Sequence, residues 1–240
     1  MANPILNENF GAQERVINGA PMTINGTINK TFMLFLLAAV PAFYTWQQFM
    51  AGFADKAMML TTIGVIVGFV MALIVTFTRN KFFIPLYAVC EGLFLGGISA
   101  MFEQQYAGIA FQAITGTFAA LFSMLMLYRM NLIRCTDKFR GVLLTATISI
   151  AVLYLMQIIA SFFHYSIPGI FNSGMVGIGF SVFVVAIASL NLIIDFYFIE
   201  QGSRNMLSKD YEWFGAFGLM VTLVWLYVEI LRLLSKLRER

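Results

Sequence analysis

The chain has 240 residues, of which 60% are hydrophobic and only 11% are charged. Soluble domains usually carry about 25% charged residues, so this composition excludes an ordinary soluble fold and favours an integral membrane protein. The net charge of +3 argues against nucleic-acid binding, and two cysteines with a single histidine argue against a disulfide framework and the usual zinc or haem site.

Seven apolar stretches follow a polar N-terminal segment, and each is close to the ~20 residues that a spanning helix needs. They are Thr31–Phe49, Ala57–Phe77, Ile84–Phe102, Ile109–Tyr128, Gly141–Phe163, Met175–Phe198 and Phe214–Leu234. The breaks between them are short and polar, so consecutive helices are expected to be antiparallel neighbours. The apolar runs are continuous rather than alternating, which excludes a β-barrel.

The sequence therefore predicts an all-α, polytopic membrane protein with seven transmembrane helices, whose immediate partner is the lipid bilayer. A polar cytoplasmic segment covers residues 1–30, the seven-helix transmembrane domain covers 31–237, and a short basic tail covers 238–240.

Lysine and arginine are concentrated in alternate connections between the predicted spans. Ten of them lie in the N-terminal segment and in the second, fourth and sixth loops, whereas the opposite loops contain only Lys56. Basic loops stay in the cytoplasm, so a cytoplasmic N-terminus is predicted. The basic tail then lies outside, unless the last segment is re-entrant; its length favours a full crossing.

Two pairs of glycines have the spacing that lets membrane helices approach closely. Gly64 and Gly68 form one pair, and Gly92 and Gly96 form the other. For the first pair, the general abundance of glycine in membrane helices is an equally good explanation.

Three carboxylates fall inside the predicted spans: Glu91, Asp195 and Glu229. An acid at the centre of a bilayer costs roughly 2.5–3.5 kcal/mol on insertion scales, so such residues commonly mark routes for ions or protons. Structural roles are the alternative, because Asp195 is near its helix end and Arg232 follows Glu229 by one turn, where it can form an ion pair. Acids at the span boundaries, Glu212 among them, are expected to be solvated.

Two facing acids would share one proton, because like charges close together cannot both ionise cheaply. When both are ionised, the pair repels itself and attracts a cation such as Ca²⁺, which prefers oxygen ligands. A proton-dependent gate for cations is therefore a physically reasonable function.

Three segments carry a family resemblance: "EGLFLGGISAMFE", "LNLIIDFYFIEQG" and "DYEWFGAFGLMVTLVWLYVEILRLLSKL". They resemble the bacterial YccA-like branch of the Bax inhibitor family, the transmembrane Bax inhibitor motif proteins, from "MTINGTINKT" to the C-terminus. The resemblance implies a six-helix bundle around a central last helix. It also implies a pH-sensitive calcium leak through acids on the last two helices, matched here by Asp195 and Glu229, with Ca²⁺ as a transient ligand and no other cofactor.

The partner of Asp195 stays open between two glutamates. At a rise of 1.5 Å per residue, Asp195 and Glu91 each lie about 10 Å from the inner end of their helices, whereas Glu229 lies about 25 Å along its own. Asp195 and Glu229 become level only if the chain around Tyr211–Gly218 first runs along the membrane surface. Depth therefore favours Glu91, and the family resemblance favours Glu229.

A second function of a different class is a regulatory membrane protein that binds other membrane proteins, such as a membrane protease. The sequence contains no Ser/His/Asp set, GxSxG motif or nucleotide-binding loop, so we expect no enzymatic activity and no catalytic residues.

Overall fold

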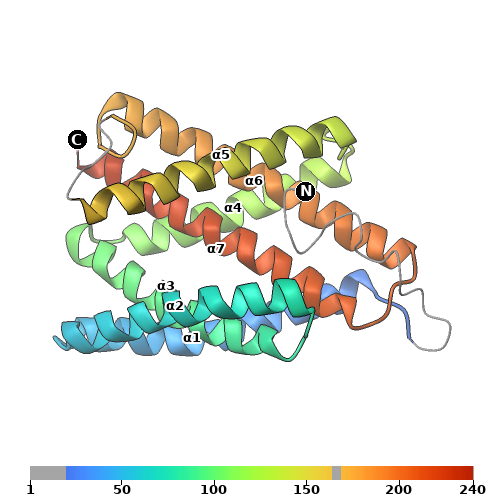
Figure 1. Ribbon diagram of the computed structural model, residues 1–240, viewed down its shortest axis with the longest axis horizontal. Coiled ribbons are helices and arrows are strands. Elements are labelled where there is room, and N and C mark those ends of the chain that lie inside the picture. The colour runs from blue at the N-terminus through green and yellow to red at the C-terminus, as the bar shows by residue number, and fades with distance from the viewer. Residues whose placement is uncertain (1–19, 164–168, 240) are drawn as a thin grey trace.

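The computed structural model describes residues 20–163 and 169–239, so Arg15, His164 and Arg240 lie outside the described residues. The described chain forms seven helices, all of them long and apolar enough to cross a membrane (Figure 1). They are α1 Ile24–Met50, α2 Ala54–Thr78, α3 Phe83–Gln105, α4 Ile109–Arg129, α5 Asp137–Phe162, α6 Met175–Arg204 and α7 Tyr211–Arg238. The prediction of an all-α polytopic membrane protein is confirmed.

The helices extend beyond the apolar stretches. Polar residues at the bundle ends add further helical turns, and capping side chains stabilise the starts of two of the helices. The α1 helix begins at Ile24, where the Thr23 side chain accepts a hydrogen bond from the Gly26 amide at 2.9 Å. Thr136 caps α5 in the same way, accepting from the Phe139 amide at 3.2 Å. Such caps satisfy amides that have no partner within the helix.

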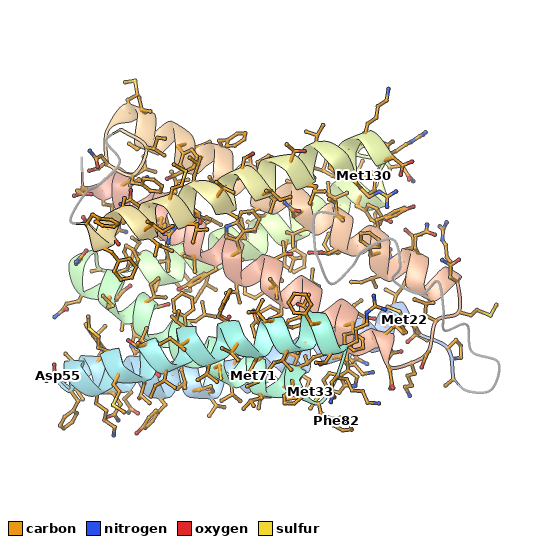
Figure 2. All side chains as sticks on the ribbon, in the orientation of Figure 1. Met22, Met33, Asp55, Met71, Phe82 and Met130 are labelled. Atoms are coloured by element: carbon orange, nitrogen blue, oxygen red, sulfur yellow. The ribbon has the colours of Figure 1, made fainter. Side chains whose placement is uncertain are left out.

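The start of α1 and the end of α7 lie at opposite ends of the bundle (Figure 1). The Met22 amide donates to the Leu207 carbonyl at 2.7 Å, which joins the start of α1 to the α6–α7 turn. Arg238 donates to the Ala107 carbonyl at 2.8 Å at the other end. Successive connections between helices lie at alternate ends of the bundle. In Figure 2, Met22 before α1 and Phe82 before α3 lie toward one end, and Asp55 at the start of α2 lies at the opposite end. The chain therefore crosses the bundle seven times.

The last helix forms the centre of the bundle. In its most apolar 18-residue window, 83% of residues are buried, against 11% for α5. It packs against α1, α3, α4 and α6, while α5 lies on the outside against α6. This arrangement agrees with the central last helix that the family resemblance implies.

Glycines bring α3 into close contact with its two neighbours. A Cβ atom at Gly96 would overlap the Ala42 carbonyl of α1, and one at Gly92 would overlap the Ala38 carbonyl. On the opposite side, a Cβ atom at Gly64 of α2 would lie 2.7 Å from the Cys90 carbonyl. Gly96, Gly92 and Gly64 thus lie where helix backbones touch.

Candidate functional site

Asp195 lies in the interior, on the segment of α6 that faces the other helices. It is 1% exposed, and the four residues before it are also buried. It lies nine residues before Arg204, the end of α6, which is about 14 Å at 1.5 Å per residue. One turn earlier, the Asn191 amide donates to Thr147 Oγ1 of α5 at 3.1 Å. The carboxyl group therefore lies inside the bundle, more than two helical turns from the end of α6.

Glu229 occupies a different setting, in the distal half of α7. It is 1% exposed and its two oxygens have separate partners. The Tyr154 hydroxyl of α5 donates to Oε2 at 2.7 Å, and Arg232 donates to Oε1 at 3.3 Å. The Arg232 guanidinium also lies 4.9 Å from the centre of the Tyr154 ring. Glu229 is thus a charge-compensated group that joins α5 to α7.

Glu91 of α3 points toward α2 at the position where Gly68 leaves room for it. A Cβ atom at Gly68 would lie 3.5 Å from Glu91 Oε1. Within the described part of the chain, Glu91 Oε2 is buried and has no hydrogen-bond partner. Because an unsatisfied buried oxygen is costly, Glu91 is a position where a proton, a water molecule or a cation would stabilise the fold.

The three acids lie at two depths. Glu91 is eight residues from the start of α3, about 12 Å, and so lies at a depth similar to that of Asp195. Glu229 is 18 residues from the start of α7, about 27 Å, and α7 is continuous from Tyr211 without a surface segment. Asp195 and Glu229 are therefore separated by about 13 Å along the bundle.

Helix packing also separates Asp195 from Glu91. Among the described helices, α3 and α6 have no backbone contact with each other. Both α3 and α6 pack instead against α1 and α7. The identity of a partner for Asp195 stays a prediction.

An apolar layer fills the core between the two depths. Leu192 of α6 and Leu223 and Leu226 of α7 belong to one buried cluster, and each is at most 4% exposed. In this conformation, closely packed leucines lie between the depths of Asp195 and Glu229.

Glu212 was expected to be solvated, and that expectation is wrong. It is 1% exposed, in the first turn of α7, and accepts hydrogen bonds from the Thr23 amide at 3.0 Å and the Thr23 hydroxyl at 2.9 Å. It also forms a salt bridge with Lys30 of α1. The partners are 182 positions apart, so no local sequence pattern predicts this contact.

Among the described residues, no three His, Cys, Asp or Glu side chains lie close enough together to hold a metal ion. A Ca²⁺ ion usually takes six to eight oxygen ligands, so an ion that meets one of these acids would also need water or carbonyl oxygens.

Comparison with protein families gives one match. A family model described as Bax inhibitor 1 like matches residues 3–239 of the chain. Comparison with individual curated proteins gave no significant match. The match agrees with the family resemblance noted in the sequence, and the assignment to the YccA-like branch stays a prediction.

Proposed function

The chain belongs to the Bax inhibitor 1-like family, and from this premise we propose that it forms a pH-sensitive pathway for cations, with Ca²⁺ as the transported ion. The observation that carries the proposal is the set of three carboxylates, Glu91, Asp195 and Glu229, inside a seven-helix membrane bundle. Ionisable groups at such positions are costly and are commonly retained for ion or proton movement.

Proton occupancy of Asp195 is the proposed switch. A protonated carboxyl is neutral and compatible with the apolar layer of leucines. Ionisation puts a charge in the interior, and entry of water and a cation lowers the cost of that charge. The open state is therefore favoured at higher pH and the closed state at lower pH.

Glu229 has a different role in the proposal. Its charge is already compensated by Arg232, so it is a weak attractor of cations. A cation that passes Leu223 and Leu226 must then displace or bypass this ion pair. Opening thus requires movement of α7, on which the leucines and the ion pair all lie.

The proposed location is the bacterial inner membrane, with the start of α1 on the cytoplasmic side. Nine described basic residues lie at the end of the bundle where α1 starts, which is the distribution expected of a cytoplasmic face. They are Lys30, Arg79, Lys81, Arg129, Arg134, Lys138, Arg140, Arg204 and Lys209. At the opposite end, Arg232, Lys236 and Arg238 each bind acceptors of the protein.

The test is Ca²⁺ uptake into liposomes that contain only this protein, measured between pH 6 and pH 8. The parent is compared with Asp195→Asn, Glu91→Gln and Glu229→Gln. Asp210→Asn is the matched control, because Asp210 is an exposed acid at the start of α7. We expect the parent's uptake to rise with pH and Asp195→Asn to flatten this profile. An unchanged profile in Asp195→Asn would show that Asp195 is not the switch.

The alternative is a regulatory protein that binds other membrane proteins, such as a membrane protease. It is favoured by α5, which packs mainly on α6 and leaves most of its apolar surface exposed. The same liposomes distinguish the two functions, because a purely regulatory protein gives no uptake above that of protein-free liposomes. Both proposals assign the chain no catalytic residue and no resident cofactor.

A further inference from the structure

A cavity of about 570 Å³ lies between α1, α3, α4 and α7, apart from the buried acids. Its floor is formed by Ser99 of α3 and by Leu223 and Tyr227 of α7. Its size is within the range of about 300–1,000 Å³ that is typical of sites for small organic ligands.

The cavity opens sideways, toward the lipid. Its rim contains Phe43 of α1, which is 66% exposed, and Phe111 of α4, which is 75% exposed. Among the described helices, α1 and α4 have no backbone contact with each other, so they leave the entrance between them. The surrounding medium at this position is the acyl region of the bilayer.

The lining identifies the chemistry of the occupant, because it contains no charged side chain. Its three hydroxyl groups are already bonded within the protein. Ser99 donates to the Leu95 carbonyl at 2.5 Å and lies 2.6 Å from the Tyr227 hydroxyl, and Thr117 donates to the Ala113 carbonyl at 2.8 Å. A charged ligand would lose hydration without gaining an oppositely charged partner, whereas an apolar chain would lose nothing.

We propose that this cavity binds an acyl chain of a membrane phospholipid, which enters between α1 and α4. Trp46, at the mouth of the cavity and near the end of α1, is well placed to lie beside the polar end of that lipid, as tryptophans do at membrane interfaces. The bound chain would contact Leu223 and Tyr227 of α7, so the site reaches the central helix of the bundle.

The test uses purified protein in detergent, to which a phospholipid with brominated acyl chains is added while tryptophan fluorescence is measured. Bromine quenches only a nearby indole, so a bound chain gives saturable quenching. We expect Trp46→Phe to reduce this saturable component and Trp213→Phe to retain it, because Trp46 lines the cavity and Trp213 lies at the opposite end of the bundle. Absence of saturable quenching in the parent would overturn the proposal.

A second pair of variants compares a substitution that fills the cavity entrance with the same substitution outside the cavity. Ala39 lines the cavity and is exposed, so Ala39→Phe should occupy the entrance and abolish saturable quenching. Ala151→Phe makes the same change on the exposed face of α5 and should bind like the parent. Equal quenching in both variants would contradict the site. Saturable quenching by a brominated fatty acid but not by the phospholipid would refute a membrane lipid as the occupant.

Discussion

Replacing Glu212 with glutamine should destabilise the bundle, although the residue lies far from the proposed switch. The carboxylate is 1% exposed, and it joins the first turn of α7 to Thr23 and Lys30 at the start of α1. Glutamine has nearly the same shape and retains an oxygen acceptor, so the substitution tests the charge rather than the packing.

The expected loss follows from the surroundings of the pair. Removing one partner of a fully buried ion pair costs about 3–5 kcal/mol. The Lys30 side chain is 17% exposed, so part of its charge is still hydrated after the change and the cost is lower. Glu212 also lies near the N-termini of α1 and α7, where a negative charge contributes about 0.3–1 kcal/mol at each. We therefore expect a loss of about 2–3 kcal/mol.

The assay is thermal unfolding of the purified protein in detergent at a fixed heating rate. For a chain of this size, a loss of 2–3 kcal/mol corresponds to a fall in Tm of about 5–10 °C. Asp210→Asn is the matched control. Asp210 also lies at the start of α7 and pairs with a lysine, Lys81, but its side chain is 54% exposed. Exposed pairs contribute about 0–1 kcal/mol, so this control should melt close to the parent. Equal shifts in the two variants would refute the reasoning from burial.

Three further predictions concern packing, the Glu229 cluster and a loop thiol. Gly96→Ala should lower Tm because the new Cβ atom overlaps the backbone of α1. Gly179→Ala is the control and should raise Tm slightly, because Gly179 is a helical glycine with open space around it. Similar Tm shifts in the two variants would contradict the close contact at Gly96. Tyr154→Phe should cost about 1.5–3 kcal/mol in the same melt, because Glu229 loses a hydrogen bond; an unchanged Tm would contradict the role of this bond. Burial raises the pKa of the Cys135 thiol to about 11, so its alkylation by a maleimide should speed up about tenfold per pH unit from pH 8 to pH 10; a plateau near pH 9 would be inconsistent with that pKa.

The helices could be predicted from the sequence because the bilayer imposes a length on each of them. Seven apolar runs near 20 residues give seven spanning helices, and no other fold accommodates them. The helix ends were less predictable, since α1 begins at Ile24, well before the first apolar residues of the predicted span. There the helix is set by the Thr23 cap and by contacts with α7, and hydropathy does not report these.

For the candidate site, the sequence likewise predicts which acids are buried but not which residues they face. Burial of Asp195 and Glu229 follows from their positions within apolar runs. Which acids face each other depends on the rotation and neighbours of each helix, which spacing along the chain does not determine. Glu212 illustrates the point, because its burial depends on Lys30, which belongs to the first helix.

The burial of α7 has a consequence for how the protein is made. The ribosome synthesises α7 after the four helices that pack against it, so those helices must wait in the membrane without the helix that fills their centre. Synthesis proceeds at about 5–20 residues per second, so the 28 residues of α7 take on the order of seconds. During that interval the apolar core positions of α1, α3, α4 and α6 face lipid instead of protein. A chain arrested before α7 would therefore lack the helix on which α1, α3, α4 and α6 converge, and would be a natural substrate for membrane quality control.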